Sequence, residues 1–178
     1  MNRLNRQRVY LAGAIDRAED RGKAWRESIT PFLESMSVQV FNPLTKASDI
    51  GVETDDVQNI KARLKSNAQY DELSEMMKII RAVDLRLVDI CDFLVVYLDL
   101  NIHLCGTLEE LFLANRQKKP ILVCVAQGKR QAPDWLFGTI PHEMIFDNWD
   151  ELKEYLVYIN TAKTLPNNLK RWCFFNLK

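Results

Sequence analysis

Two adjacent glutamates stand at the start of a predicted helix, where a carboxylate could take part in catalysis. They are Glu109 and Glu110, in the run GTLEEL that begins at Gly106. The run follows residues 93–98, the most apolar segment of the chain and one of strand length. A helix start offers free backbone N–H groups and stabilises a carboxylate in its first turn. Ordinary acidic residues in a first turn are the alternative, but the place after an apolar strand favours a functional site.

Three aspartates accompany the same apolar segment. Asp84 falls among apolar neighbours, so it either caps a turn or has a raised pKa that suits proton transfer. Asp92 comes directly before the strand and is expected to be a turn or cap residue. Asp99 follows the strand, at the end where sheets of parallel strands bind their ligands.

The end of the first predicted strand, residues 9–15, is rich in small residues. Ala12 and Gly13 stand there, shortly before Asp16, and small side chains let a ligand approach the backbone closely. Tight packing of the strand against a helix is the alternative. Neither the glycine pattern of dinucleotide-binding sites nor that of P-loops occurs in the chain.

Aromatic, histidine and cysteine residues offer further candidates. Trp25, Trp135 and Trp172 could stack on a base, although a place in the core or an interface is the commoner role. His103 and Cys105 are two potential metal ligands, but a zinc site needs three or four from the protein. We therefore expect no metal and no cofactor. The four cysteines form no CxxC pair, which predicts reduced and mostly buried thiols.

The elements that must position these residues alternate between strand and helix. Strands are predicted at 9–15, 38–41, 93–98, 120–125 and 143–146, and the central ones are apolar throughout. Helices are predicted from Trp25 onward, at 108–117 and at 148–159, with one long helix or two joined ones over 57–88. This pattern predicts an α/β fold with a doubly wound, mostly parallel sheet flanked by helices.

Ligands are then expected outside the carboxyl ends of the strands, just after Ile15, Phe41, Leu98 and Val125. Residues 1–165 are predicted to form a single domain, followed by a tail at 166–178. The tail carries Trp172, Phe174 and Phe175, which are costly to expose. It should pack on its own domain or across a subunit interface, with the interface slightly favoured.

Composition narrows the class of protein. The 178 residues include 47% apolar and 27% charged ones, which is typical of a globular domain. Lys plus Arg and Asp plus Glu both number 24, and this balance argues against a dedicated nucleic-acid binder. No apolar run approaches the length of a membrane span, and no secretion signal stands at the N-terminus. We therefore expect a cytoplasmic protein that binds neither nucleic acid nor membrane.

Five motifs together resemble the nucleoside 2-deoxyribosyltransferase family. They are VYLAG at 9–13, Asn42-Pro43, Asp84-Leu85 with Cys91-Asp92, the pattern GTxxELxxA from Gly106, and Lys119-Pro120. The likeness extends over residues 9–125, and GTxxELxxA is its most specific part. It implies a flavodoxin-like sheet and an enzyme that cleaves the N-glycosidic bond of 2′-deoxynucleosides. Such enzymes transfer the deoxyribosyl group to another nucleobase, or to water in a hydrolase branch.

The resemblance also assigns roles to residues. Glu110 corresponds to the nucleophile and Asp84 to the aspartate that contacts the base. The remaining substrate-binding residues are expected to be Ala12, Gly13, Asp16, Trp25, Asn42, Asp99, Gly106 and Thr107. Transferases of the family often carry an acid shortly before the motif glycine, where this chain has His103 and Leu104, so the sugar contacts differ. The partners implied are small-molecule nucleosides and nucleobases, and the protein is expected to be a homo-oligomer.

Three other functions remain open at this point. Hydrolysis of deoxynucleoside monophosphates needs a phosphate cradle, and residues 16–21 place three acids among two arginines, which favours nucleosides. A non-catalytic nucleotide-sensing module could use the same fold. A nicotinamide-nucleotide glycohydrolase would use similar carboxylate chemistry.

Overall fold

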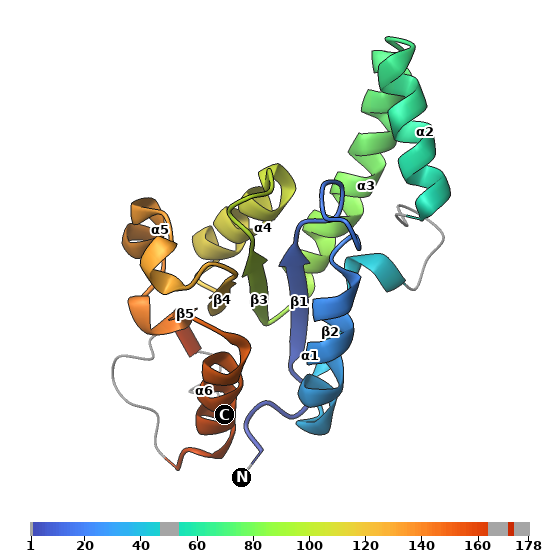
Figure 1. Cartoon of the computed structure of the whole chain (residues 1–178). Coiled ribbons are helices and arrows are strands. Elements are labelled where there is room, and N and C mark those ends of the chain that lie inside the picture. The colour runs from blue at the N-terminus through green and yellow to red at the C-terminus, as the bar shows by residue number, and fades with distance from the viewer. Residues whose placement is uncertain (1, 47–53, 164–170, 173–178) are drawn as a thin grey trace.

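Apolar strands that are buried on both faces build the centre of the molecule. The computed structural model describes residues 2–46, 54–163 and 171–172, and within them five parallel strands form one sheet. The strands are β1 (Arg8–Gly13), β2 (Gln39–Phe41), β3 (Phe93–Leu98), β4 (Ile121–Val125) and β5 (Ile145–Phe146). Their order is β2-β1-β3-β4-β5, so the predicted doubly wound α/β fold is confirmed (Figure 1).

Helices cover both faces of this sheet. Aromatic contacts bring α1 (Lys23–Ser35) and α6 (Trp149–Thr161) to one face, through Tyr97 of β3. The other face holds α3 (Tyr70–Ile90) and α4 (Cys105–Arg116), and Tyr10 of β1 contacts α4 there. The shorter elements are α2 (Asp55–Ser66), α5 (Asp134–Thr139), and the 3₁₀ turns η1 (Pro43–Thr45), η2 (Lys129–Gln131) and η3 (His142–Met144).

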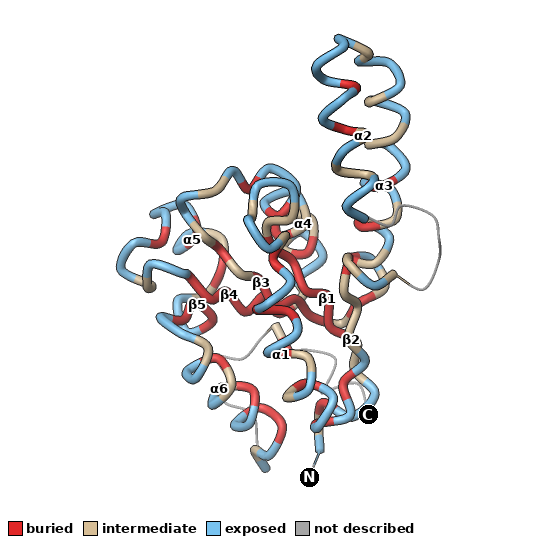
Figure 2. The backbone as a smooth tube through the Cα atoms, turned by 45° about the vertical axis from the view of Figure 1, so that its right-hand side comes forward, coloured by how far each residue is buried: buried red, intermediate tan, exposed pale blue. Residues whose placement is uncertain are grey.

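The helical segment between β2 and β3 is a hairpin of two helices. Thr54 caps the start of α2, and Ala68, at φ 52°, lies in the turn that separates α2 from α3. The outer part of the hairpin extends away from the sheet, and much of its surface is exposed (Figures 1 and 2). The inner part of α3 packs on the body of the domain and carries the buried Asp84. None of the described helices is long and apolar enough to cross a membrane.

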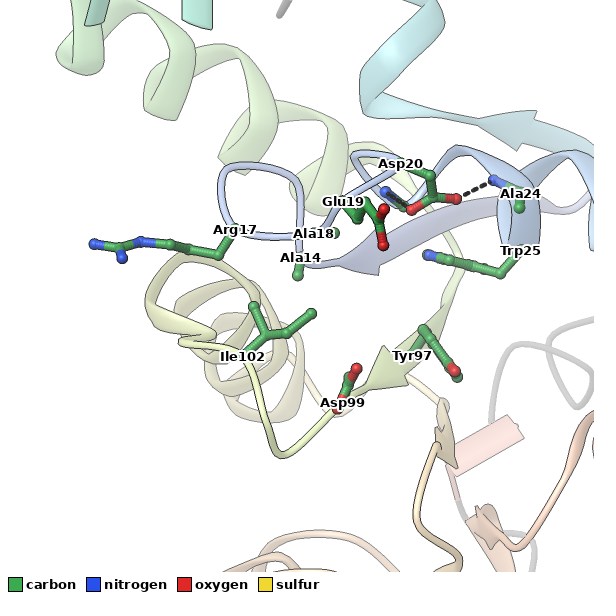
Figure 3. A pocket seen from close by; sticks show the side chains of 11 residues that line it. Ala14, Arg17, Ala18, Glu19, Asp20, Ala24, Trp25, Tyr97, Asp99 and Ile102 are labelled. Carbon is green, nitrogen blue, oxygen red and sulfur yellow. Dashed lines mark hydrogen bonds between the residues drawn. The ribbon is translucent and has the colours of Figure 1, made fainter. Parts of the chain in front are cut away.

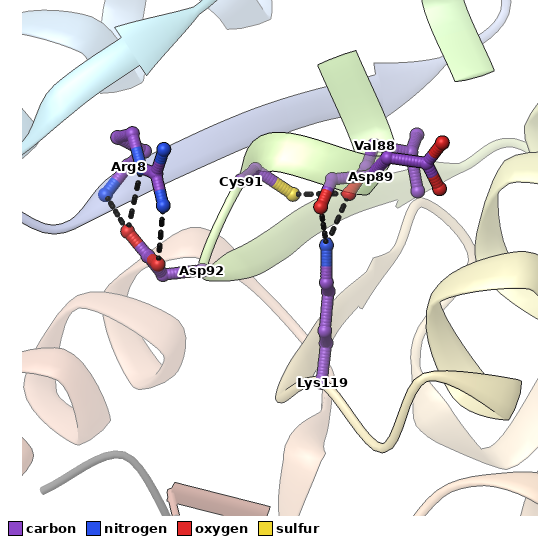
Figure 4. Close-up of polar contacts among 6 residues, drawn as sticks. All are labelled: Arg8, Val88, Asp89, Cys91, Asp92 and Lys119. Atoms are coloured by element: carbon purple, nitrogen blue, oxygen red, sulfur yellow. Dashed lines mark hydrogen bonds and ion pairs between the residues drawn. The ribbon is translucent and has the colours of Figure 1, made fainter. Parts of the chain in front are cut away.

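Polar contacts at the amino ends of the strands join α3 to the sheet. Asp92 accepts hydrogen bonds from the backbone N–H of Arg8 at 2.7 Å and from its guanidinium at 3.0 Å. Lys119 donates to the carbonyl groups of Val88 and Asp89, the latter at 2.7 Å, and so caps the end of α3 (Figure 4). Asp92 therefore lies in the turn between α3 and β3, which is one of the two roles expected from the sequence, while Cys91 is the C-cap residue of α3. Burial raises the pKa of the neighbouring Cys91 thiol to about 12, as expected for a buried thiol.

Two residues of the C-terminal tail are described, and both pack on their own domain. Trp172 is fully buried against Phe93, with ring centroids 5.4 Å apart, and its indole N–H donates to the Tyr155 hydroxyl at 2.9 Å. Arg171 donates to the side chain of Asn115 at 2.6 Å. Trp172 therefore follows the alternative in which the tail packs on its own domain, not the slightly favoured interface position, because strand β3 and helix α6 provide its surroundings. Phe174 and Phe175 lie outside the described residues.

Candidate active site

Glu110 is held against one face of the sheet by a tyrosine of strand β1, which lies between β2 and β3. The Tyr10 hydroxyl donates a hydrogen bond of 2.7 Å to Oε1 of Glu110. Tyr10 is fully buried, and this burial, together with the charges of Glu110 and Asp84, raises its pKa well above the ordinary value. The phenol consequently keeps its proton and remains a donor at neutral pH. Glu110 itself is half-buried, so its carboxylate is fixed in orientation without being sealed in the core.

The two adjacent glutamates have separate surroundings. Glu109 forms an exposed, two-pronged ion pair with Arg81 of α3, and the hydrogen bonds from Arg81 lower the pKa of Glu109. Neighbouring residues on a helix point about 100° apart. The α4 backbone thus places Glu110 against β1 while Glu109 faces solvent, which agrees with the choice of Glu110 as the functional carboxylate.

Asp84 lies near the same tyrosine, but it has a cationic partner that the sequence did not suggest. Lys46 places its ammonium group 2.8 Å from Oδ1 of Asp84, and the two side chains are only 2% and 10% exposed. Both Asp84 and Glu110 act electrostatically on the Tyr10 phenol. The structure therefore brings together residues from β1, α3, α4 and the end of η1.

Asn42 contributes to this arrangement as a cap. Its side-chain oxygen accepts a hydrogen bond of 3.0 Å from the backbone N–H of Leu44 and so starts the turn η1. Lys46 follows that turn directly. In this structure Asn42 positions the chain leading to Lys46, and its predicted contact with a substrate stays a prediction.

The turn after β1 is organised by a buried arginine. Arg26 of α1 is fully buried, and its guanidinium donates to the carbonyl groups of Leu11, Gly13 and Gly22 at 3.3, 2.9 and 2.9 Å. Arg26 thereby ties the end of β1 to the start of α1. The sequence offered a weak signal, since position 26 interrupts the apolar stripe that Trp25 and Ile29 belong to.

Trp25 is buried and other side chains pack on its ring, which leaves little of the ring for stacking on a base. The Arg26 guanidinium lies 4.4 Å from its ring centroid, and the Trp149 ring is stacked at 5.5 Å with an interplanar angle of 15°. A Cβ at Gly13 would stand 2.8 Å from the Trp25 ring. The small residues at the end of β1 thus allow close packing of strand and helix, with Ala12 fully buried as well. Trp25 also lines the pocket described below, and its predicted contact with a substrate stays a prediction.

Substituting Gly13 by alanine should destabilise the protein. The added methyl group must displace the Trp25 ring, and overpacking of this kind costs about 1–3 kcal/mol. Chemical denaturation measures the change. Gly106→Ala is the matched control, because a Cβ at that helical position meets nothing within 4 Å. Equal effects of the two substitutions would contradict the packing role of Gly13.

Two of the three acids in the loop after β1, Asp16 and Asp20, are already engaged by the protein, and the third, Glu19, lines the pocket described below. Asp16 accepts hydrogen bonds from Lys61 and Gln58 of α2, at 2.5 and 2.7 Å. Partial burial alone would raise the pKa of Asp16, but these hydrogen bonds lower it. Asp20 accepts from the N–H groups of Gly22 and Ala24, both at 2.8 Å, and so caps α1. In this structure the Asp16 side chain fastens the loop to α2, and its predicted substrate contact stays a prediction.

A pocket of about 460 Å³ opens at the carboxyl ends of β1 and β3 (Figure 3). Sheets of this strand order bind ligands between these two strands. Asp99 lines the pocket, as predicted, and accepts a hydrogen bond of 2.7 Å from Gln127. Neither Glu110 nor Asp84 lines it. Its walls are formed by Ala14, Arg17, Ala18, Glu19, Asp20, Gly22, Ala24, Trp25, Tyr97, Asp99 and Ile102.

The remaining predicted site residues, Gly106 and Thr107, lie at the start of α4. Gly106 faces open space, whereas Thr107 is buried. Cys105 is an exposed free thiol at the first residue of the helix. The other two described cysteines, Cys91 and Cys124, are buried free thiols, which agrees with the prediction of reduced and mostly buried thiols. Over the described ranges, no three His, Cys, Asp or Glu side chains come together in a way that could hold a metal ion.

Comparison with known proteins gives matches of structure alone. No family model and no curated protein sequence matches the chain. The 2-deoxyribosyltransferase of Bacillus psychrosaccharolyticus superposes with a TM-score of 0.55 at 16% identity, over 83% of this chain and 91% of the other. The fold is that of the 2-deoxyribosyltransferases. The 2-deoxyribosyltransferase of Leishmania mexicana agrees, with a TM-score of 0.53 and 17% identity, over 88% of this chain and 99% of the other.

Within this 2-deoxyribosyltransferase fold, Tyr10, Lys46 and Arg26 are polar residues that sequence reasoning missed. Tyr10 had a signal, because it is the polar member of an otherwise aliphatic strand. Lys46 had none, since it stands in a polar stretch 38 residues before Asp84.

Replacing Tyr10 by phenylalanine should lower kcat about tenfold to 100-fold with a smaller change in KM. A hydrogen bond to a charged group contributes roughly 1.5–3 kcal/mol, and Phe fills the same buried volume without donating to Glu110. Steady-state kinetics measures the split, and thermal unfolding checks the fold. An unchanged kcat would show that Glu110 does not depend on this contact.

Proposed function

We propose that this protein cleaves the N-glycosidic bond of 2′-deoxynucleosides with Glu110 as nucleophile and transfers the deoxyribosyl group to another nucleobase. The observation that carries the proposal is the fixed, half-buried Glu110 carboxylate on Tyr10, with Asp84 near the same phenol. The likeness of the fold to two 2-deoxyribosyltransferases supports it.

The chemistry suits these residues. Breaking the N-glycosidic bond builds positive charge at the anomeric carbon, which a carboxylate on one face of the sugar stabilises. An oxygen of Glu110 then bonds to that carbon, and the C–N electron pair leaves with the base, which takes up a proton from solvent water. A second base attacks the same carbon, releases Glu110 and returns its own N–H proton to solvent. Two inversions restore the original configuration, and no net proton is consumed.

The preference for deoxy substrates follows from the same charge. A 2′-hydroxyl withdraws electrons from the carbon that becomes positive and makes the transition state less stable. Asp84 is proposed to contact the base, and residues at the pocket edge, including Asp99, to contact the substrate.

Hydrolysis of deoxynucleoside monophosphates is the second candidate, and one observation favours it. The acids at 16–21 argued against a phosphate, yet Asp16 is paired with Lys61 and Asp20 caps α1. Arg17 lines the pocket beside them. Residues 16–21 therefore repel a phosphate group less strongly than their number of acidic residues suggests.

The deciding experiment incubates the protein with a panel of 2′-deoxynucleosides and their 5′-monophosphates, with and without an acceptor base, and separates the products by chromatography. A new nucleoside that forms only with the acceptor supports transfer. Free base without an acceptor supports hydrolysis, and the better substrate class identifies the preferred substrate. Binding without any turnover would support a nucleotide-sensing module instead. Nicotinamide mononucleotide in the same panel tests the glycohydrolase alternative.

A further inference from the structure

We infer that Lys46 is a positioning residue that holds Asp84 in its ionised form, so that Asp84 accepts a hydrogen bond from the nucleobase and does not supply the proton. The inference rests on the proposed function and specifies how the base is bound. It begins with the ion pair of 2.8 Å, whose side chains are almost completely removed from solvent.

The surroundings of Asp84 would otherwise favour the neutral acid. Burial disfavours a charged carboxylate, and a second carboxylate nearby disfavours it further. Glu110 is that second carboxylate, since it and Asp84 act on the same Tyr10 phenol. An ammonium group in contact reverses this preference. Lys46 therefore supplies the positive charge that lets both carboxylates stay ionised in one site.

Stability alone gives a weak reason for such a pair. Taking two charges out of water costs about as much as their attraction returns, so buried ion pairs are often no more stable than apolar replacements. A functional role, in which Lys46 keeps Asp84 ionised, explains why the pair is buried. The backbone that leads to Lys46 is held by a local contact, because Asn42 caps η1 and Lys46 directly follows that turn.

An ionised Asp84 changes what the base must present. A carboxylate can only accept, so the edge of the base that meets it must carry an amino group or a ring N–H. The other titratable or charged groups around this position are the Tyr10 phenol and Glu110, with Arg26 acting on Tyr10 from α1. The raised pKa of the phenol keeps it neutral, so the inference assigns the acidic limb of the pH profile to Asp84.

The test compares pH profiles of kcat/KM for wild type, Lys46→Met and Lys46→Arg, using the best deoxynucleoside of the panel. Without Lys46 the buried Asp84 should ionise only at higher pH. The acidic limb of the kcat/KM profile should therefore shift to higher pH by about one to three units. Activity at pH 7 should fall and recover at higher pH. Lys46→Arg keeps the charge and should keep the wild-type limb. Lys78→Met on the exposed part of α3 is the control for lost lysine charge, because Lys78 forms an exposed ion pair with Glu75.

A second set of variants, made in the Asp84→Asn protein, distinguishes an effect of Lys46 on Asp84 from an effect on Glu110. In Asp84→Asn, the further change Lys46→Met should leave the acidic limb where it is. A shift there would assign the effect to Glu110 and overturn the inference. Higher activity of Lys46→Met at pH 7, or an alkaline limb that moves up, would show that the protonated Asp84 is the active form and would also overturn it.

The variants also keep the two hypotheses apart. Turnover by the wild type that is lost in Glu110→Gln supports the proposed function. If the pH profile of Lys46→Met is then unshifted, the proposed role of Lys46 is wrong while the proposed function stands. No turnover by wild type would contradict the proposed function and this inference with it. Circular dichroism confirms that each variant is folded, and Lys46→Arg together with the Asp84→Asn background keeps the test decisive if Lys46→Met unfolds.

Discussion

Replacing Glu110 by glutamine should lower turnover at least about 1,000-fold while the fold is retained. The amide can still accept the hydrogen bond from Tyr10, but it cannot form the ester with the sugar. Removing a catalytic nucleophile typically costs several orders of magnitude in kcat. Single-turnover assays with the substrate identified by the panel measure the loss, and thermal unfolding checks the fold.

Glu109→Gln is the matched control, because its carboxylate is exposed and pairs with Arg81. It should change turnover only slightly. The opposite result, loss with Glu109→Gln and none with Glu110→Gln, would mean that the neighbouring carboxylate is the nucleophile. A 2-fluorinated deoxynucleoside should also leave a covalent adduct on Glu110, which mass spectrometry of the digested protein can locate.

Replacing Arg26 by leucine should destabilise the protein by at least about 3 kcal/mol and disorder the turn after β1. The guanidinium satisfies the carbonyl groups of Leu11, Gly13 and Gly22, and each buried group left without a partner costs roughly 1–3 kcal/mol. The cation that covers Trp25 is lost as well. Chemical denaturation measures the free energy of unfolding, and tryptophan fluorescence reports the altered surroundings of Trp25.

Arg81→Ala serves as the comparison, because that arginine forms an exposed ion pair on the helix surface. Exposed pairs contribute little, so unfolding should hardly change. Similar unfolding curves for Arg26→Leu and wild type would show that water replaces the guanidinium at these carbonyl groups.

The sequence predicts the architecture well because its signals are local. Runs of apolar residues with strand length mark β3 and β4, and the three- and four-residue spacing of apolar residues marks α1 and α6. The joined helices over 57–88 prove to be two, as one of the alternatives had it. The predicted last strand at 143–146 is shorter, since η3 takes up its first residues.

The site was predicted less completely because its contacts join distant parts of the chain. The position at a helix start drew attention to Glu109 and Glu110 together, and the choice of Glu110 came from the family resemblance. Lys46 and Asp84 approach each other only once α3 has folded back against the end of η1, and nothing in the polar stretch around Lys46 indicates that approach. Trp25 was a candidate for base stacking, but the position of Trp149, which covers it, depends on α6 from the far end of the domain.

The pairing of β1 has a consequence for how the chain acquires its structure during synthesis. β1 leaves the ribosome early, but its longer pairing is with β3, which is synthesised about 84 residues later. This pairing extends from Val9 with Phe93 to Gly13 with Tyr97. Until then only the short β2 can cover one edge of β1. Pairings this far apart in sequence form slowly, and an apolar strand with an open edge invites association with other chains. The hairpin between β2 and β3 contains mostly local contacts and can form meanwhile, so the nascent chain holds finished helices beside an unfinished sheet.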